Sequence, residues 1–443
     1  MAVHLPKGTR DFMPRQMAHR LEVIARLRSQ FERYGFGALE TPAFERLDTL
    51  MGKYGGETEK LMFRIIKRGK GAETGQCDLG LRYDLTVPLA RVVAMNPGLP
   101  LPFKRYQIQP VWRAERPQRG RFREFYQCDA DIVGSTSPHA DAEILALLHD
   151  GLLDVGFDRF EIRVNDRRIL TELAQRAGAA DAKQEHQILI AIDKLDKIGR
   201  DGVDAELRAR GFTDTARLWE ALEVPSGTPQ ALDALDATLD GVGRDGVATL
   251  RQVVRAAASL GVEPQRIVID PSLARGADYY TGPVFEAWLV EGNMGALGAG
   301  GRYDGLIGHL SGRDTAAVGV SFGLERIVQI KEEAGQLYGD DGVPDALVVL
   351  AGDSQAIEDS CLRAAATLRR AGISVDVYLG ANRKLRKQMK LAHQRGYRWA
   401  VMIGDTEAES GTVTLKHMQR GDQTTVPLDH AAQTIRSTTA TSP

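Results

Sequence analysis

Cysteine is scarce in this chain of 443 residues, which contains only Cys77, Cys128 and Cys361. The three cysteines are odd in number and far apart, and none belongs to a Cys-x-x-Cys pair. This pattern indicates neither a disulfide framework nor a zinc site. The nine histidines include no His-x-x-x-His pair, so we assign no protein-bound metal site and expect no organic cofactor.

Long apolar runs and a strong net charge are lacking as well. No apolar run approaches the length of a membrane span, and the N-terminus has no apolar core behind basic residues. We therefore expect a soluble, cytoplasmic protein of a reducing compartment. Because 57 Lys and Arg residues balance 59 Asp and Glu residues, any RNA contact must come from local basic patches.

Glycine is abundant, but the familiar phosphate-binding patterns of glycine are missing. The glycines at 295, 298, 300 and 301 do not form Gly-x-Gly-x-x-Gly between a strand and a helix. No Gly-x-x-x-x-Gly-Lys-Ser/Thr occurs either. We interpret these glycines as allowing the backbone to approach a ligand closely.

The apolar pattern changes along the chain and predicts its organisation. Spacings of three and four predict helices at 16–34, closed by Gly35, and at 141–155. Alternation predicts strands at 160–164, 267–269, 284–288 and 317–322, and an Ala- and Leu-rich helical pattern fills the region between the first two. After a polar linker, 346–350 is a continuous apolar run of the kind found in buried parallel strands.

These patterns predict an α+β domain with an antiparallel sheet, a helical insertion and a small C-terminal α/β domain. The expected boundaries are 1–165 and 262–334 for the two parts of the α+β domain, 166–261 for the mainly helical insertion, 335–344 for the linker, 345–432 for the α/β domain and 433–443 for a flexible tail.

The stretch from Pro110 to Gly134 says most about function. Two short runs with β-like alternation flank a basic loop centred on a glycine. Gln127, Asp129 and Asp131 are spaced by two, so they would share one face of a strand. An antiparallel hairpin would then offer Arg113 to a phosphate and two or three acceptors to a cationic or polar ligand. A solvated hairpin tip accounts for the arginines equally well.

This hairpin resembles motif 2 of class II aminoacyl-tRNA synthetases, and its particular residues resemble those of the histidyl-tRNA synthetase family. The likeness extends along nearly the whole chain. Residues 8–14 resemble the opening segment of that family, 36–45 motif 1, 81–88 the amino-acid-binding loop, 275–286 and 299–306 the two segments peculiar to histidine enzymes, and 318–326 motif 3. The run Arg275-Gly-Ala-Asp-Tyr279-Tyr280, in order with the rest, is the most specific of these matches.

The resemblance implies a class II histidine–tRNA ligase, which activates L-histidine with ATP and transfers it to the 3′ end of histidine tRNA. Adenylate formation joins two anions, and arginine suits this step because it stays protonated and grips two oxygens. By resemblance, Arg113 and Arg275 are the catalytic residues, acting on the α-phosphate from opposite sides. The residues implied in ATP binding are Arg113, Glu115, Arg121, Phe125 and Arg326.

Recognition of histidine requires acceptors for its ammonium group and directional partners for both ring nitrogens. The residues implied in histidine binding are Asp84, Thr86, Arg113, Gln127, Asp131, Arg275, Tyr279 and Tyr280. Asp131 and Tyr280 would face the imidazole. If Tyr279 and Tyr280 lie in a strand, they point to opposite faces and only one is a direct donor.

For tRNA, the resemblance assigns Arg116 and Gln118 at the hairpin tip to the acceptor end. A helix from Asn382 in the tail domain is strongly basic, with Arg383, Lys384, Arg386 and Lys387, and we expect it to contact RNA. A solvated helix face is the alternative. Mg²⁺ should enter with ATP, and motif 1 implies a homodimer.

Two other classes of function remain to be weighed. Synthetase-like regulatory subunits of ATP phosphoribosyltransferase bind histidine as a sensor, but they usually lack the tail domain and the ATP and tRNA residues. Here Arg113, Arg275 and Arg326 are present and a tail domain follows. A pure RNA-binding protein would leave the histidine residues unexplained. Histidine-dependent exchange of pyrophosphate into ATP separates the ligase from the sensor.

Overall fold

Two units make up the chain in the computed structural model. Met1–Asp11 and His19–Tyr338 form the larger unit, and Phe12–Ala18 with Gly339–Pro443 form the smaller. The structure describes residues 3–51, 61–118, 120–213, 215–225, 227–274, 279–291, 295–336 and 342–439.

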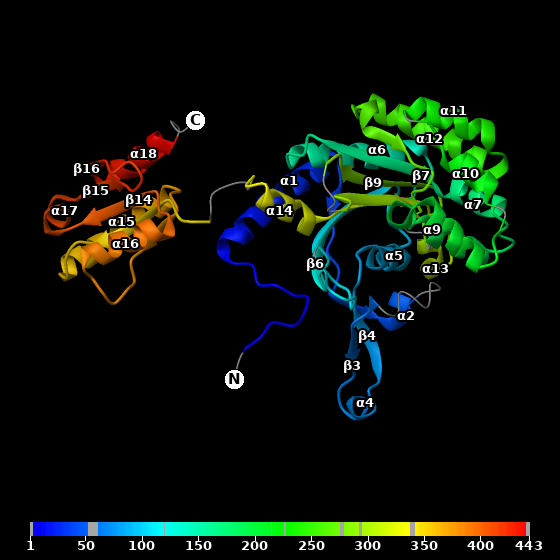
Figure 1. The fold of residues 1–443 in the computed structure, drawn as a ribbon. Coiled ribbons are helices and arrows are strands. Elements are labelled where there is room, and N and C mark those ends of the chain that lie inside the picture. The colour runs from blue at the N-terminus through cyan, green and yellow to red at the C-terminus, as the bar shows by residue number, and fades with distance from the viewer. Residues whose placement is uncertain are drawn as a thin grey trace. The chain divides into compact units, whose positions relative to one another are not determined.

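An eight-stranded sheet organises the larger unit, with the strand order β1-β5-β6-β11-β10-β9-β7-β8 (Figure 1). Neighbours are antiparallel except at the two edges, where β1 pairs with β5 and β8 pairs with β7 in parallel. The strands are β1 (Gly37–Ala38), β5 (Phe103–Trp112), β6 (Glu124–Val133), β7 (Phe160–Asp166), β8 (Ile267–Ile269), β9 (Pro283–Leu289), β10 (Gly298–Arg302) and β11 (Ala317–Phe322). The predicted antiparallel hairpin is β5 and β6.

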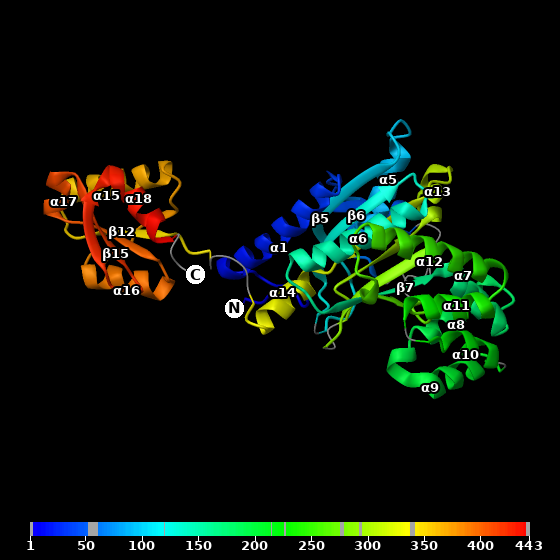
Figure 2. The same ribbon diagram turned by 90° about the horizontal axis from the view of Figure 1, so that it is seen from above.

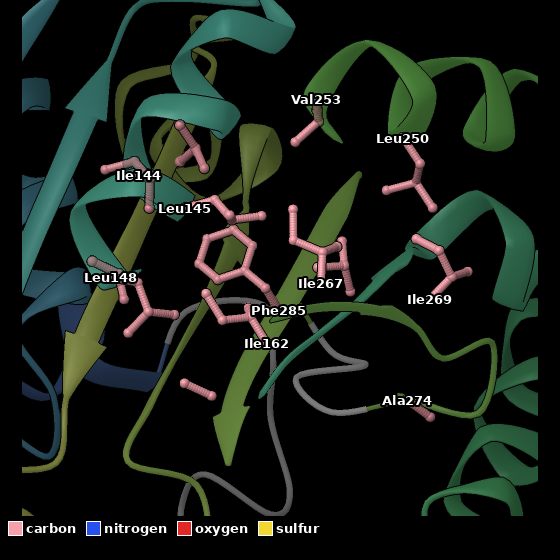
Figure 3. Close-up of a cluster of buried hydrophobic side chains, with 14 of the residues drawn as sticks. Ile144, Leu145, Leu148, Ile162, Leu250, Val253, Ile267, Ile269, Ala274 and Phe285 are labelled. Atoms are coloured by element: carbon pink, nitrogen blue, oxygen red, sulfur yellow. The ribbon is translucent and has the colours of Figure 1, made fainter. Parts of the chain in front are cut away.

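Alternation along the strands gives this sheet one apolar face and one polar face. In β6, Cys128, Ala130 and Ile132 belong to the main hydrophobic core. Gln127 and Asp129 therefore point to the opposite face. The core gathers side chains from the sheet and the helices that cover it, as Figure 3 shows for Ile144, Leu145 and Leu148, for Leu250 and Val253, and for Phe285.

Two predicted helices cover this apolar face. The first is α1 (Pro14–Arg33), which ends before Gly35 at a φ of 76°. The second is α6 (Pro138–Asp154), which begins at Ser137, whose hydroxyl accepts from the His139 amide at 3.3 Å. A Cβ on Gly151 would lie 2.7 Å from the Phe322 ring, so glycine lets α6 approach β11 closely.

The predicted helical insertion is confirmed between β7 and β8, and Figure 2 shows it beside the sheet. Its helices are α7 (Arg167–Arg176), α8 (Ala182–Ile192), α9 (Leu195–Ala209), α10 (Ala216–Leu222), α11 (Thr228–Thr238) and α12 (Gly241–Ser259), followed by the 3₁₀ helix η1 (Pro264–Arg266). Buried Leu250 and Val253 of α12 join the core of the sheet, so the insertion packs as part of the larger unit.

The polar face of the sheet carries shorter elements. α5 (Thr86–Met95) and α13 (Asp304–Ser311) share an apolar cluster there with Val133 and Ala317. By contrast, α14 (Leu324–Glu333), which follows β11, contributes its buried apolar side chains to the main core. A separate three-stranded sheet has the order β2-β4-β3. Its elements are β2 (Phe44–Arg46), α2 (Leu47–Met51), β3 (Arg64–Ile66), α4 (Lys70–Glu73) and β4 (Cys77–Leu81).

The smaller unit has a five-stranded sheet of order β13-β12-β14-β15-β16. Its elements are β12 (Ala346–Leu350), α15 (Gln355–Arg370), β13 (Val375–Val377), α16 (Leu385–Arg395), β14 (Trp399–Ile403), α17 (Asp405–Ser410), β15 (Thr412–His417), β16 (Gln423–Pro427) and α18 (Leu428–Thr439). β12 pairs in parallel with both neighbours, as its apolar run predicts. Its residues alternate between a core with α15 and α18 and a second core with α16, so both faces are covered.

Two details of the smaller unit differ from expectation. α16 begins at Leu385 rather than at Asn382, because buried Gln388 accepts from the Leu350 amide and donates to the Leu350 and Arg383 carbonyls, which keeps the preceding residues extended. α18 runs through residues where we expected a flexible tail, because Ala431 and Ile435 are buried against the sheet. Among the described helices, none combines the length and hydropathy that crossing a membrane requires.

Candidate active site

Two adjoining cavities open on the polar face of the large sheet. The first, of about 340 Å³, is lined by seven of the eight residues predicted to bind histidine: Asp84, Thr86, Arg113, Gln127, Asp131, Tyr279 and Tyr280. The second, of about 380 Å³, is lined by all five residues predicted to bind ATP: Arg113, Glu115, Arg121, Phe125 and Arg326. Arg275 lies outside the described residues. The cavities share Arg113, Gln127 and the two tyrosines.

Strand register explains how distant segments meet in the first cavity. On β6, Gln127, Asp129 and Asp131 point to the polar face, as the spacing predicts, and all three line the cavity. The residues paired with Asp131 across its two neighbouring strands are Arg105 on β5 and Gly319 on β11. The sheet therefore brings an arginine and a glycine to the carboxylate from segments that are remote in sequence.

Glycine on the two inner strands leaves room for the cavity. A Cβ on Gly319 would lie 1.9 Å from Asp131 Oδ1, and one on Gly300 would lie 2.1 Å from the Gly319 carbonyl oxygen. Real side chains do not approach so closely, so both positions require glycine. Gly300 lines the cavity in β10, which supports the interpretation that this glycine run allows close backbone approach.

Asp131 is held on both oxygens. The Tyr303 hydroxyl donates to Oδ1 at 2.5 Å, and Arg105 Nη2 lies 2.7 Å from Oδ2. Burial raises the pKa of Asp131, while Arg105 and the Tyr303 hydroxyl oppose that rise. Sequence reasoning missed Tyr303, although it lies in the 299–306 segment, and it missed Arg105. The alternation of β5 with polar residues at 105, 107 and 109 is the signal that could have found Arg105.

Asp129, one of the acceptors expected on this face of the strand, also lines the first cavity, although the resemblance assigned it no role. Its side chain is 3% exposed. Burial raises its pKa to about 7; Arg105 opposes that rise, whereas the neighbouring Asp131 increases it. This carboxyl group therefore takes up or releases a proton near neutrality, which makes it a candidate binding residue.

Asp84 reaches the cavity from the start of α5. Its Oδ1 accepts from the Val87 amide at 3.0 Å, so the carboxylate caps the first turn of the helix that begins at Thr86. Burial raises the pKa of Asp84, and hydrogen bonds from the backbone together with Arg113 oppose the rise. A cation bound here would favour the ionised form of the carboxyl group.

The tyrosine pair differs from the expectation for a strand. Tyr279 and Tyr280 lie outside any strand, and both line both cavities. Their ring centroids are 4.4 Å apart, and the Tyr279 hydroxyl donates to that of Tyr280 at 3.2 Å. The restriction to a single direct donor applied to a strand, so strand alternation does not decide here which hydroxyl meets the ligand. Burial raises the pKa of Tyr279 to about 12, so its hydroxyl stays a donor at neutral pH.

Arg113 stands where the two cavities meet. Its Nε donates to the Tyr83 carbonyl at 3.0 Å, and its guanidinium lies 5.0 Å from the centre of the Phe125 ring. These contacts restrain the side chain, and neither of them uses a carboxylate. The positive charge of Arg113 therefore stays available to ligands in the two cavities. Fixed positive charge is what the joining of two anions requires.

The second cavity continues to the start of α14. Arg326 Nη1 donates to the Ala296 carbonyl at 2.6 Å. Buried Glu325 accepts from Arg20 at 2.7 and 2.9 Å, from Arg10, and from the Tyr126 amide at 3.3 Å. The opening segment of the chain thus anchors the helix that carries Arg326. On the opposite wall Arg121 lies 3.9 Å from Glu115.

Comparison with known proteins decides the family. A model of the family described as histidyl-tRNA synthetase matches residues 8–327, and one described as anticodon binding domain matches residues 345–438. The chain belongs to the histidyl-tRNA synthetase family.

Relatives match this family member over nearly its full length. The histidine–tRNA ligase of Aeropyrum pernix is 42% identical over 435 residues, and that of Gloeobacter violaceus is 39% identical over 460 residues; each match covers 97% of both proteins. The crystal structure of histidyl-tRNA synthetase from Nostoc sp. PCC 7120 superposes with a TM-score of 0.84 at 31% identity, covering 99% of this chain and 100% of that one. The recognised family and the class II fold are both confirmed.

The residues of this synthetase predicted to meet tRNA are all at the surface. Arg116 and Gln118 are exposed at the tip of the β5–β6 hairpin, where Gln118 and Arg121 form a bridge around Gly120. In the smaller unit, Arg383, Lys384, Arg386 and Lys387 are also exposed, and Arg383 pairs with Glu358. Exposure permits RNA contact, so the predictions stand as proposals.

Possible metal ligands are dispersed over the described residues. There, no three His, Cys, Asp or Glu side chains are grouped so as to hold a metal ion. The second cavity presents Glu115 and Glu325, of which Glu325 is engaged by two arginines. These residues fit an ion whose ligands come mainly from a bound phosphate group.

Proposed function

We propose that the two cavities form one active centre, in which the first holds L-histidine and the second holds ATP. The chain is a histidine–tRNA ligase, which forms histidyl-adenylate and then transfers histidine to the 3′ end of histidine tRNA. The observation that supports the division is that the two predicted sets line adjoining cavities, which share Arg113, Gln127, Tyr279 and Tyr280 at their junction.

Arg113 acts at the reacting atoms. At the junction it would contact the histidine carboxylate and the α-phosphate together, which cancels their repulsion and stabilises the charge of the pentavalent phosphorus. Arg326 and Arg121 would hold the outer phosphates, while Glu115 and Phe125 would bind the adenine. For Arg275, the role at the opposite side of the α-phosphate stays a prediction.

Histidine is recognised by acceptors on the walls of the first cavity. Asp84, Thr86 and Gln127 would bind the ammonium group, and Asp131 with Tyr280 would face the imidazole. A site that pairs the ring nitrogens rejects apolar isosteres strongly, because such ligands leave buried polar groups unpaired. Positioning and charge carry the reaction, and no protein nucleophile is required.

Further partners follow from the same assignment. Mg²⁺ enters with ATP and screens the phosphate charge, with the phosphate oxygens as its main ligands. The hairpin tip, through Arg116 and Gln118, meets the acceptor end of the tRNA. The basic surface formed by Arg383, Lys384, Arg386 and Lys387 meets its anticodon region. The enzyme works in the cytoplasm as a homodimer.

Exchange of labelled pyrophosphate into ATP tests the function directly. The purified protein should catalyse exchange with L-histidine and with no other standard amino acid, and it should charge histidine tRNA. Measurable histidine binding without exchange would instead identify a histidine sensor. A structure described as an ATP phosphoribosyltransferase regulatory subunit/histidyl-tRNA synthetase, from Bacillus halodurans C, shares the fold at 20% identity and a TM-score of 0.75.

A further inference from the structure

A cluster of charged side chains forms the floor of the first cavity. Asp84, Asp129 and Asp131 line it, and Arg105 lies beneath them without lining either cavity. Arg105 is 1% exposed, so its charge acts on its neighbours through protein rather than through water. The three carboxylates differ in how many close contacts their oxygens already make with neighbouring side chains and amides.

Asp131 is the carboxylate that Arg105 engages. Its oxygens contact Arg105 at 2.7 Å and the Tyr303 hydroxyl at 2.5 Å. The other contacts of the Arg105 guanidinium are long, at 3.5 Å to the Gln107 side-chain oxygen and 3.4 Å to the Leu85 carbonyl. The shortest of these contacts of Arg105 is therefore its ion pair with Asp131, which neutralises the charge of that carboxylate.

Asp129 is far less engaged. The Gln127 side-chain amide lies 3.4 and 3.5 Å from its two oxygens, which are weak contacts, and the Ser321 hydroxyl is its other side-chain partner. Across the cavity, Asp84 raises the pKa of Asp129 further by like-charge repulsion. A cation placed between these two carboxylates would relieve that repulsion and use the free acceptor positions.

Resting on the proposed function, we propose that Asp129 binds the α-ammonium group of L-histidine directly, opposite Asp84. Arg105 is a positioning residue, which holds Asp131 and thereby leaves Asp129 as the carboxylate available to the ammonium. This deepens the assignment of the first cavity, since Asp129 and Arg105 had no role in it.

Proton exchange accompanies this contact. Burial raises the pKa of Asp129 to about 7 in the free protein. The ionisable groups around it are Asp131 and Cys128 on its own strand, Arg105 on β5, Asp84 before α5, and Tyr279 before β9. A bound ammonium favours the ionised carboxylate, so below pH 7 histidine binding releases a proton from Asp129.

Calorimetric titration measures this release. L-Histidine is titrated at pH 6.5 into wild type and Asp129→Asn, in two buffers of different ionisation enthalpy. Wild type should release up to about one proton more than the variant, and the variant should bind histidine roughly 10- to 100-fold more weakly, the fold-change of one charged hydrogen bond. The analogue 3-(imidazol-4-yl)propionate, which lacks the ammonium, should bind both proteins alike. Equal proton release and affinities within about two-fold would overturn the role of Asp129.

Arg105 is tested by the pH profile of kcat/KM for histidine in pyrophosphate exchange. Removing its positive charge in Arg105→Gln should move the midpoint to higher pH, because the carboxylates then ionise less readily. Arg105→Lys should restore the midpoint in part. A purely structural role would lower the active fraction equally at every pH, and an unchanged midpoint would overturn the positioning role.

A matched control separates loss of stability from loss of binding. Asp166 is a buried carboxylate paired with Arg168 at 2.7 Å, and it lines neither cavity. Asp166→Asn should lower Tm and leave the midpoint and the histidine KM unchanged. If wild type neither binds histidine nor supports exchange, the proposed function itself fails; if wild type is active and the variants match it, only the inference fails.

Discussion

Arg113 is the arginine that lines both cavities among the described residues. We expect Arg113→Ala to lower the rate of histidine-dependent exchange by roughly 10²–10³, or about 3–4 kcal/mol, because the stabilising charge acts mainly in the transition state. Histidine affinity, measured by calorimetry without ATP, should change much less. An equal loss in both measurements would place Arg113 in substrate binding alone.

Asp129 also links the site to stability. Its pKa is raised to about 7 in the folded protein, whereas an unfolded aspartate ionises near its ordinary value of 3.8. The folded state therefore binds more protons between these values, and the stability that Asp129 contributes at low pH is lost as pH rises through about 7.

Asp129→Asn should remove this loss in the histidine-free protein. The free energy of unfolding of the variant minus that of wild type should increase between pH 4 and pH 8, by on the order of 2–4 kcal/mol. Thermal unfolding at several pH values measures the difference. A difference in Tm that stays constant across this range would contradict the raised pKa.

At the scale of elements, β10 and β11 shape the first cavity because each strand has a glycine where a side chain would fill the space. Gly319→Ala would place a Cβ 1.9 Å from Asp131 Oδ1 and 3.0 Å from the Ala130 carbonyl oxygen. We expect a loss of about 1–3 kcal/mol in stability and a larger rise in KM for histidine than for ATP, since Asp131 must move.

Gly98→Ala is the matched control for this change, because a Cβ there meets no atom within 4 Å. It should leave both KM values and Tm close to those of wild type. If Gly319→Ala behaves like Gly98→Ala, the close approach of β11 to Asp131 does not shape the cavity.

At the scale of the whole molecule, the smaller unit has its own two hydrophobic clusters, and none of its described residues lines either cavity. Deleting residues 343–443 should therefore leave part of the pyrophosphate exchange while strongly impairing the charging of tRNA. Exchange and aminoacylation are measured on the same preparation, with the full chain as reference. Full charging by the shortened protein would separate the smaller unit from tRNA recognition.

The basic surface of the smaller unit supplies a milder version of this experiment. Changing Lys384, Arg386 and Lys387 to Gln should weaken tRNA binding and make its dependence on salt less steep, because fewer phosphates are neutralised. Pyrophosphate exchange should be unaffected. Normal charging at physiological salt would identify these residues as a solvated face.

What the sequence by itself determined is local. Apolar spacing predicted α1 and α6, the strand of continuous apolar residues predicted the parallel pairing of β12, and spacing by two placed Gln127, Asp129 and Asp131 on one face. Motifs in order predicted the family, which the comparisons confirm. These features depend on residues that are close in sequence or on sequence motifs, so the sequence alone is enough to predict them.

What only the tertiary structure decided is the pairing of distant segments. Strand register brings Arg105 and Gly319 to Asp131, and burial among several strands raises the pKa of Asp129. Tyr279 and Tyr280 both line the site because they lie outside a strand, and no local sequence pattern predicted that conformation. Charge interactions and close contacts depend on distances through space, and those distances exist only once the sheet has formed.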